Sequence, residues 1–166
     1  IHKASARVDL KHRLAMLKLL VATNSSWSLD LTEAYLTTPQ SSYDTFSKMD
    51  LPYKCLLIGS DSLMTLPSWH DWQLLAQHVH LIVVDRHESS VQFSKEIGDF
   101  FQITNNKYDL YNYQSGCLFF LKNKAKLISS TVIRGLLLQQ KFDLAEAYLS
   151  PVVWQYVVKN DLYQTT

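Results

Sequence analysis

Short apolar runs alternate with helical patterns along most of this chain. Three runs, at 55–58, 80–84 and 117–121, consist mainly of apolar residues without alternating polar positions. Such runs indicate strands whose two faces are both covered, as in a parallel sheet beneath helices. The first two runs and the segment between them fit in about 30 residues, the size of a βαβ unit with a right-handed crossover. The pattern therefore predicts an α/β fold with a mostly parallel sheet.

Helical periodicity is clearest near the start of the chain, over residues 8–23. Leu10, Leu14, Leu17 and Val21 recur there at spacings of four, three and four residues, which predicts an amphipathic helix. Weaker signals predict a short strand over 27–31 and loops over 36–42 and 104–115. Further helices are expected over 44–49, 69–77, 90–101, 130–140, 144–148 and 151–159.

The size and composition of the chain narrow its class. With 166 residues, 47% of them hydrophobic and 19% charged, the chain is expected to form one domain over residues 1–166. The net charge of +1 argues against a nucleic acid or an anionic membrane as a partner. No apolar run approaches the roughly 20 residues that span a bilayer. Cys55 and Cys117 lie in apolar runs, so we expect buried thiols in a reducing cytoplasm rather than a disulfide.

Polar residues gather directly after the predicted strands. Gly59 and Asp61 follow the first run, Asp85 and Arg86 follow the second, and a hydroxyl-rich stretch follows the third. Ligands of open parallel sheets bind beyond the carboxyl ends of the strands. The sequence therefore predicts a ligand site at this edge of the sheet.

The hydroxyl-rich stretch reads Ile-Ser-Ser-Thr-Val-Ile-Arg over residues 128–134 and opens a predicted helix. A helix start has unpaired N–H donors and a partial positive charge, so it suits an anion. Ser129, Ser130 and Thr131 would add hydroxyls, and Arg134 would share a helix face with Ser130, four residues earlier. Together these groups could bind a phosphate. The stretch by itself favours the simpler alternative, a capped helix with an arginine in solvent.

Four other residues have a structural interpretation beside a functional one. Gly59 would let a ligand approach the backbone, and Asp61 could accept hydrogen bonds from ribose hydroxyls; alternatively they are a turn glycine and a helix cap. Trp69 could stack on a flat ring, or it could share a helix face with Trp72 and pack inward. Arg86 could pair with a phosphate or carboxylate, or form a surface salt bridge that contributes little.

Several common site types do not occur in the sequence. The six histidines include His78 and His80, two residues apart, but no cluster offers the three or four ligands of a zinc site, and we expect no bound metal. The G-x-S-x-G turn of hydrolases, the P-loop and the G-x-G-x-x-G motif are also missing.

Several stretches together resemble one family. Residues 128–134 match the motif I-S-S-T-x-I-R, and residues 58–63, followed by Leu66 and Trp69, match I-G-x-D-S-L…L…W. Four further matches are weaker. Residues 81–86 match a strand end that reads L-I-V-x-x-R, and residues 1–3 match the tail of a P-P-H-K turn. Residues 13–17 match the helix that follows this turn, and residues 148–163 match a closing helix with an L-Y ending. In these motifs the chain resembles bacterial nicotinate-nucleotide adenylyltransferases, members of the nucleotidyltransferase superfamily with an H-x-G-H motif.

The resemblance implies a fold and a reaction. The fold would be a Rossmann-like, doubly wound, mostly parallel sheet. Nicotinic acid mononucleotide and ATP, with Mg²⁺, would give nicotinic acid adenine dinucleotide and pyrophosphate in a cytoplasmic step of NAD biosynthesis. The protein would mainly align the two reactants and stabilise the charge that develops between them.

The resemblance also implies residue roles. Arg134 would be the catalytic group on this chain, and Trp69 would stack on the nicotinate ring. Gly59 and Asp61 would hold the adenosine ribose of ATP. The remaining ATP-binding residues would be Ser129, Ser130, Thr131, Arg134 and His2, and Ser42 and Arg86 would join Trp69 in binding the nicotinate nucleotide.

Two departures from the family pattern matter. Residues 39–46 stand where the family reads close to P-S-Y-T-x-D-T-L; Asp44 agrees, Ser41 replaces the tyrosine, and Ser42 keeps the hydroxyl of the threonine. The segment G-G-x-F-D-P-x-H-x-G-H would precede Ile1 and is absent, together with the first strand, helix and second strand. We therefore expect a chain that is processed, cut or part of a longer product. Either the first strand is present as unassigned density or as another chain, or the sheet has a strand-wide gap. Residues 1–166 alone are expected neither to catalyse the reaction nor to fold as a stable monomer.

Two other functions remain open at this point. Another adenylyltransferase of the superfamily would use nicotinamide mononucleotide or phosphopantetheine as the acceptor. A nucleotide-binding remnant without catalytic activity would have lost the H-x-G-H segment. The sequence does not determine the oligomeric state.

Overall fold

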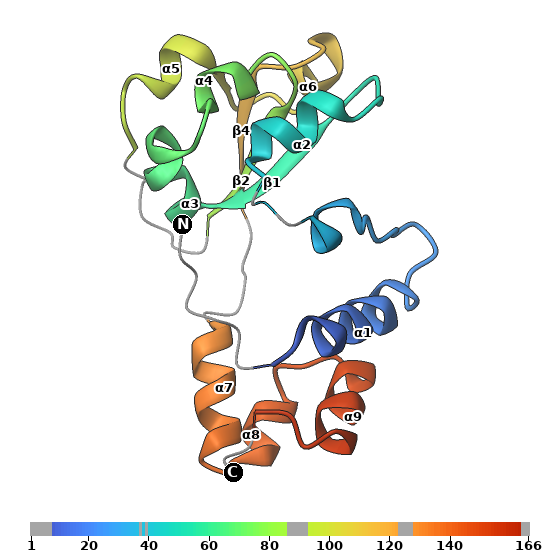
Figure 1. The fold of residues 1–166 in the computed structure, drawn as a ribbon. Helices are drawn as coiled ribbons and strands as arrows, with labels where there is room; N and C mark the ends of the chain where they lie inside the picture. Colours follow the sequence, from blue (N-terminus) through green and yellow to red (C-terminus); the bar gives the residue numbers. More distant parts are fainter. Residues whose placement is uncertain (1–7, 37, 39, 86–92, 123–127, 164–166) are drawn as a thin grey trace. The chain divides into compact units, whose positions relative to one another are not determined.

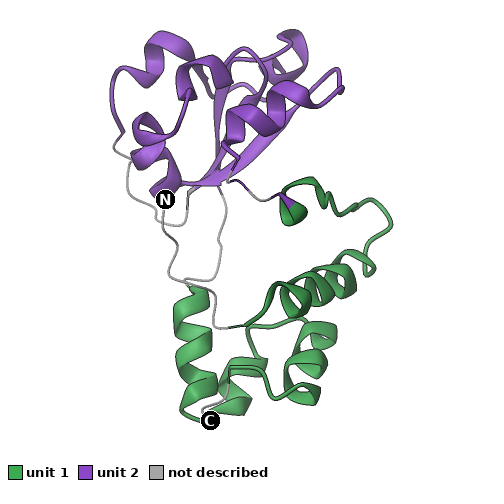
Figure 2. Ribbon diagram, in the orientation of Figure 1, with its two compact units in different colours: residues 1–35, 127–166 green, residues 36–126 purple. Residues whose placement is uncertain are grey.

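The computed structural model describes residues 8–36, 38, 40–85, 93–122 and 128–163 (Figure 1). These residues form two compact units (Figure 2). Unit 1 combines residues 1–35 with 127–166, and unit 2 comprises residues 36–126. Each unit is considered by itself below.

A four-stranded parallel sheet forms the centre of unit 2. Its strands are β1 (Cys55–Gly59), β2 (His80–Asp85), β3 (Gln102–Thr104) and β4 (Cys117–Lys122). They are ordered β1-β2-β4-β3, and every neighbouring pair is parallel. The predicted α/β fold with a parallel sheet is therefore confirmed. The expected strand-wide gap does not occur among these four strands, because each one is hydrogen-bonded to the next and β1 lies at an edge.

The helical segments that contribute Leu63 and Trp72 pack on one face of this sheet. Alternate residues of paired parallel strands share a face, and Ile58, Leu81 and Leu118 belong to one buried cluster. The same cluster contains Leu63 and Trp72 from the helical segments. The helices of unit 2 are α2 (Ser42–Lys48), α3 (Ser60–Thr65), η2 (Leu66–Ser68), α4 (Trp72–Leu75), α5 (Ile97–Phe100) and α6 (Asp109–Asn112).

The opposite face of the sheet is covered unevenly. Leu57 is 62% exposed, so the expectation that both faces of β1 would be buried is wrong at this position. Cys55 is also exposed, whereas Cys117 in β4 is buried, and both thiols are free. The expectation of free thiols is thus confirmed, but only one of the two is buried. The strand β2 lies between β1 and β4 and keeps the cysteines apart.

The buried histidine His80 joins β2 to the start of β4. Its side chain is fully buried, its Nδ1 accepts a hydrogen bond from the Cys117 backbone N–H at 3.1 Å, and its Nε2 lies 3.1 Å from the Tyr113 carbonyl oxygen. Because Nδ1 accepts, the ring is neutral and Nε2 carries the proton that it donates to Tyr113. Burial lowers the pKa of His80, and the Tyr113 carbonyl opposes this effect.

We expect the protein to lose stability as the pH falls below about 6.5, the ordinary pKa of histidine. The unfolded chain takes up a proton on His80 that the folded chain resists, so stability is complete above this pH and declines below it. Urea unfolding at pH 7.5 and 5.5 measures the loss. The variant His80→Asn should reduce this pH dependence, whereas His78→Gln, on the neighbouring and more exposed histidine, should retain it. Equal pH dependence in His80→Asn and the wild type would contradict this role.

Unit 1 consists of helices around a second apolar cluster. Its elements are α1 (Leu10–Val21), η1 (Thr32–Tyr35), α7 (Ser130–Leu138), α8 (Phe142–Glu146) and α9 (Pro151–Lys159). Leu137, Ala145 and Val157 are buried at the centre of the cluster, one from each of α7, α8 and α9. The His12 Nδ1 lies 3.0 Å from the Tyr156 hydroxyl, which links α1 to α9.

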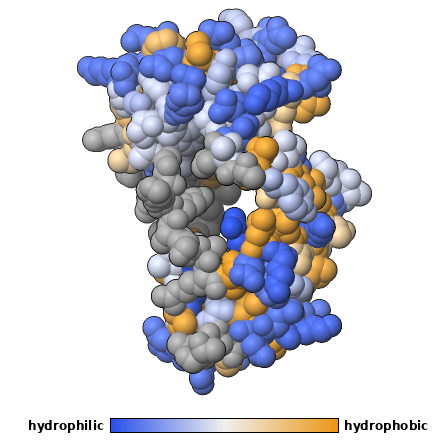
Figure 3. Space-filling view, viewed as in Figure 1, coloured by the Kyte–Doolittle hydropathy of each residue, from blue (hydrophilic) through white to orange (hydrophobic). Residues whose placement is uncertain are grey.

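The first helix forms as expected but packs through a different face. Met16 contacts the cluster, whereas Leu10 and Leu17, from the predicted apolar face, are 40% and 43% exposed. Figure 3 shows apolar side chains at the surface along this helix. No helix in the described ranges is long and apolar enough to cross a membrane.

Several short elements differ from expectation. Residues 27–31 form no strand, because the Asp30 side chain accepts a hydrogen bond from the Thr32 N–H at 2.7 Å and turns the chain into η1. The strand β3 lies between the helix expected over 90–101 and the loop expected over 104–115, where no strand was expected, and α6 lies within that expected loop. The expected helix over 69–77 is reduced to the single turn α4, because Asp71 adopts a left-handed backbone conformation with φ 51°.

Candidate functional site

The hydroxyl-rich stretch begins α7 in unit 1. Ser129 has extended backbone angles and is the N-cap, since its Oγ accepts a hydrogen bond from the Val132 N–H at 3.2 Å. The Ser130 and Thr131 N–H groups belong to the first two helical residues, which have no acceptor within the helix. Both side chains are exposed. The start of α7 therefore presents two amides and two hydroxyls outward.

Arg134 bends back towards this helix start. Its Nε donates to the Ser130 carbonyl oxygen at 3.1 Å, and its Nη2 lies 3.5 Å from the Thr131 Oγ1. The sequence expectation that Arg134 and Ser130 share a face is confirmed. The simpler alternative, a capped helix with Arg134 in solvent, is correct about the cap. It is not correct about Arg134, which is half-buried and lies against the first turn of the helix. A guanidinium, hydroxyls and amides thus meet at one end of α7.

The end of β1 offers a second set of candidate groups, in unit 2. β1 ends at Gly59 and α3 begins at Ser60 without an intervening residue. Gly59 is the N-cap, with φ −80° and ψ 163°, so the turn-glycine interpretation fails: any residue can adopt these angles. Asp61 is exposed in the first turn of α3 instead of capping it. Gly59 has no Cβ and is partly exposed, so it could let a ligand approach the backbone at the strand end.

Trp69 lies between the core of unit 2 and its surface. It follows the single-turn helix η2 and has an extended backbone, so it does not share a helix with Trp72, as one alternative assumed. Its side chain is partly buried against the core, whereas Trp72 is 3% exposed and contacts Phe100 edge-on. The Trp69 Nε1 atom is buried and has no hydrogen-bond partner. The inward-packing interpretation thus applies fully to Trp72 and partly to Trp69.

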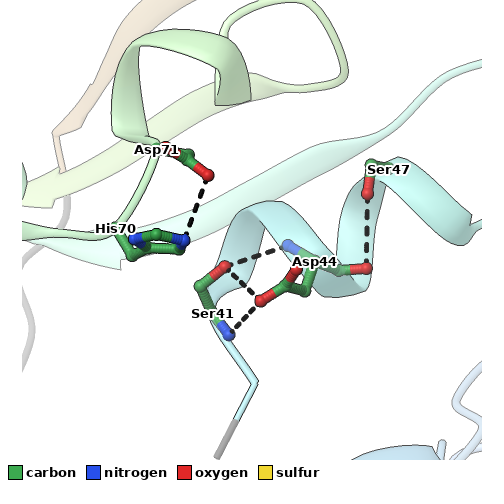
Figure 4. A network of polar contacts seen from close by, with 5 residues as sticks. All are labelled: Ser41, Asp44, Ser47, His70 and Asp71. Atoms are coloured by element: carbon green, nitrogen blue, oxygen red, sulfur yellow. Dashed lines mark hydrogen bonds and ion pairs between the residues drawn. The ribbon is translucent and has the colours of Figure 1, made fainter.

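The start of α2 is held by a capping box that the sequence analysis missed. The Ser41 Oγ accepts a hydrogen bond from the Asp44 N–H at 3.0 Å, and the Asp44 carboxylate accepts one from the Ser41 N–H at 3.0 Å (Figure 4). The signal was visible, because a serine followed three residues later by an acidic residue is a common N-terminal pattern. Asp44 thus has a structural role, while Ser42 occupies the first helical position.

His70 and Asp71 lie across from this helix start in Figure 4. The His70 Nε2 is 3.1 Å from the Asp71 carboxylate, and the pair is largely exposed. The Ser41 backbone N–H and hydroxyl lower the pKa of Asp44, and the charges of Lys48 and His70 act in the same direction. His70 is therefore close to α2, so the loop after Trp69 and the start of α2 are neighbours.

We expect Ser41→Ala to lower the free energy of unfolding by about 1 kcal/mol, the usual effect of removing a serine cap. The substitution removes the acceptor of the Asp44 N–H and the hydroxyl that donates to the Asp44 carboxylate. Ser41→Thr keeps both groups and should retain nearly the full stability. Urea unfolding of the two variants beside the wild type measures the effect; equal losses in both would contradict the capping role.

The candidate residues fall into two sets, each positioned within its own unit. Unit 1 carries the residues whose groups suit a phosphate, which are Ser129, Ser130, Thr131 and Arg134. Unit 2 carries Gly59 and Asp61 at the end of β1, and Trp69 and Ser42 around the start of α2. His2 and Arg86 lie outside the described residues. Among the described residues, no group of three or more His, Cys, Asp or Glu side chains could hold a metal ion.

Sequence comparisons show which proteins the chain as a whole is similar to. The family model for cytidylyltransferase-like proteins matches residues 1–136. A protein of Aeromonas hydrophila named probable nicotinate-nucleotide adenylyltransferase is 31% identical over 98% of this chain and 78% of its own length. Relatives with the same name in Psychromonas ingrahamii and Pseudoalteromonas atlantica are 29% and 31% identical over 98% and 99% of the chain, which covers 78% and 77% of their lengths.

A solved structure supports the fold independently. The nicotinic acid mononucleotide adenylyltransferase of Plasmodium falciparum, complexed with NaAD, superposes with a TM-score of 0.65 at 17% identity. The match covers 98% of this chain and 78% of that chain. At this identity the likeness concerns the fold alone, and it agrees with the Rossmann-like α/β architecture expected from the sequence.

Proposed function

Because the chain belongs to the cytidylyltransferase-like family, we propose that it is a nicotinate-nucleotide adenylyltransferase. The reaction transfers AMP from ATP to nicotinic acid mononucleotide and releases pyrophosphate. One observation carries the proposal: curated relatives with this name are about 30% identical over nearly the whole chain.

The start of α7 is the proposed binding site for the phosphates of ATP. Ser130 and Thr131 offer amides and hydroxyls, and Arg134 already lies against them. Amides at a helix start and a forked guanidinium are well suited to phosphate oxygens. His2 is proposed to join the same nucleotide. Gly59 would leave space for the adenosine, and the exposed Asp61 carboxylate would accept hydrogen bonds from its ribose hydroxyls.

The acceptor nucleotide is proposed to bind around the start of α2. Trp69 packs against the core and is partly exposed, and an exposed part of its indole could stack on a pyridine ring. Ser42 at the first helical position offers a hydroxyl nearby. Arg86 is proposed to pair with the phosphate or carboxylate of the acceptor.

The chemistry requires no covalent intermediate with the protein. A phosphate oxygen of nicotinic acid mononucleotide attacks the α-phosphorus of ATP, and the bond from that phosphorus to the β-phosphate oxygen breaks. The electron pair of this bond leaves with pyrophosphate. Arg134 would stabilise the negative charge that grows on the phosphate chain, which is how proteins mainly accelerate phosphoryl and nucleotidyl transfer.

Mg²⁺ is proposed to enter with ATP. The exposed Ser130 and Thr131 side chains are oxygen donors of the kind that Mg²⁺ prefers, and this ion usually binds through substrate phosphates and water. The ion would neutralise part of the phosphate charge. The residues at the start of α7 therefore suit a metal carried by the nucleotide.

We further propose that residues 1–166 belong to one nucleotidyltransferase domain and that the protein works in the cytoplasm. Cys55 in β1 and Cys117 in β4 are both free thiols, which is compatible with a reducing compartment.

The decisive experiment is an assay of the protein expressed from its complete gene. ATP and Mg²⁺ are supplied with nicotinic acid mononucleotide, nicotinamide mononucleotide or phosphopantetheine, and the dinucleotide and pyrophosphate products are quantified. The highest kcat/KM with nicotinic acid mononucleotide supports the proposal. A preference for either other acceptor reassigns the enzyme within the superfamily, and ATP binding without turnover indicates a nucleotide-binding remnant.

A further inference from the structure

Arg134 contacts the first turn of α7 through one edge of its guanidinium group. The Nε group donates to the Ser130 carbonyl oxygen at 3.1 Å, and Nη2 lies 3.5 Å from the Thr131 Oγ1. Nε and Nη2 form the side edge of this planar group, and Nη1 and Nη2 form its end edge. Each edge carries a pair of N–H bonds that can bind an oxyanion as a fork. The contacts to Ser130 and Thr131 therefore use the side edge and do not involve Nη1.

The spacing of residues along α7 produces these contacts. Arg134 follows Ser130 by four residues and Thr131 by three, so the three residues lie on one side of the helix. Side chains of a helix tilt towards its N-terminus, which directs the guanidinium group at the first turn. The Ser130 carbonyl has two lone pairs, so it can accept from Nε as well as from the backbone N–H four residues later. The backbone thus provides one contact, and the Thr131 hydroxyl provides the other.

The helix that carries these groups is anchored within unit 1. Leu137 of α7 is 2% exposed, and Ile133 packs against the same apolar cluster. At its start the helix is fixed by the Ser129 cap, which accepts from the Val132 N–H at 3.2 Å. The first two helical N–H groups have no acceptor within the helix. The side edge of the guanidinium group is therefore attached to the same rigid turn that presents these two amides.

We propose that Thr131 is a positioning residue for Arg134: its hydroxyl holds the side edge of the guanidinium group against the helix, so that the end edge binds two oxygens of one phosphate group of the nucleotide. The inference rests on the proposed function and deepens it, because that function places the phosphates of ATP at the start of α7. The Thr131 side chain then acts through Arg134, whereas its backbone amide acts on the phosphate directly. A side chain that is held in place before binding loses less conformational freedom when the nucleotide arrives.

A double-mutant cycle on the protein expressed from its complete gene tests this role. Thr131→Val removes the acceptor of Nη2 but keeps the shape of the side chain and the backbone amide. It should lower kcat/KM for ATP by about three- to tenfold, the lower range for coupled neighbours. KM for nicotinic acid mononucleotide should change less than about twofold, within ordinary surface effects. Thr131→Ser restores the hydroxyl and should return kcat/KM close to the wild-type value.

The second half of the cycle uses an Arg134→Ala background, which has no guanidinium group to position. Thr131→Val should change kcat/KM for ATP by less than about twofold there, because coupled substitutions are not additive. Ser130→Ala is the matched control, since it removes the neighbouring hydroxyl but keeps the carbonyl that accepts from Nε. Its effect should be the same factor in both backgrounds. An equal effect of Thr131→Val in both backgrounds would overturn the proposal and assign the Thr131 hydroxyl to the phosphate itself.

A second measurement requires neither turnover nor a folded Thr131 variant. Isotope-labelled arginine gives separate Nε–H and Nη signals in NMR spectra of the wild type, and Arg134→Lys identifies those of Arg134. Saturating inorganic pyrophosphate should leave the Arg134 Nε–H protected from exchange with water, because it stays bonded to Ser130, and should slow rotation of the Nη groups.

Faster exchange at Nε or unchanged Nη rotation would overturn the proposal. If the wild type shows the expected signals but forms no dinucleotide from nicotinic acid mononucleotide, the proposed function fails and the positioning of Arg134 for a phosphate is still supported.

Discussion

Arg134→Ala is expected to lower kcat/KM by about tenfold to a hundredfold in the protein expressed from its complete gene, because a charge-assisted contact to a phosphate contributes roughly 1.5–3 kcal/mol. The alanine removes the guanidinium that lies against Ser130 and Thr131 at the start of α7. It leaves the Ser129 cap in place, because the cap bonds to Val132 and not to Arg134. Steady-state kinetics with ATP and with nicotinic acid mononucleotide measure the loss.

The control for this variant is Arg134→Lys, beside a comparison of thermal unfolding. Lysine keeps the charge but loses the fork, so it should restore only part of the activity. Both variants should unfold near the wild-type temperature, since the side chain is only half-buried and takes part in no described ion pair. Kinetics of Arg134→Ala that equal those of the wild type would exclude a role for Arg134 in the reaction.

Trp69→Ala should affect both stability and acceptor binding. Fully buried large aromatic residues contribute about 3–5 kcal/mol over alanine. For this partly buried side chain we expect a loss of about 2–3 kcal/mol in the free energy of unfolding. KM for nicotinic acid mononucleotide should rise by about two- to tenfold, the range for a lost aromatic pair, and more than KM for ATP.

Two milder substitutions separate packing from stacking at this position. Trp69→Phe keeps an aromatic ring and sacrifices no hydrogen bond, because the Nε1 atom has no partner. Trp69→Leu keeps apolar bulk against the core without a flat ring. We expect KM for the acceptor to stay low in Trp69→Phe and to rise in Trp69→Leu, as measured in folded samples. Equal KM values in Trp69→Leu and the wild type would assign Trp69 to packing alone.

The longer elements were predictable because their signals are local. The apolar runs at β1, β2 and β4 and the periodic segments at α1 and α9 were recognised within a few residues of their ends. β3 has three residues and α6 has four, which is too short for either period to emerge. The helix expected around Trp72 shrinks to one turn because of the left-handed Asp71, which no periodicity could indicate.

The arrangement of the candidate site residues was likewise predictable only where it depends on short spacings along the chain. The spacing of Ser130 and Arg134 correctly indicated a shared helix face, since four residues make about one turn. The spacing of Trp69 and Trp72 misled, because it assumed a continuous helix where the backbone is extended. The capping role of Asp44 could have been inferred from Ser41, three residues earlier. The assignment of binding roles remains a prediction for all of these residues.

The sequence by itself determined the α/β class, the principal helices and strands, and the family to which the chain belongs. These properties depend on residue types at short spacings, which backbone hydrogen bonding and amphipathic burial translate into local structure. The tertiary structure alone decided the placement of β4 between β2 and β3 and the neutral state of His80. Each of these involves residues far apart along the chain, whose proximity depends on strand pairing or on packing into a common core.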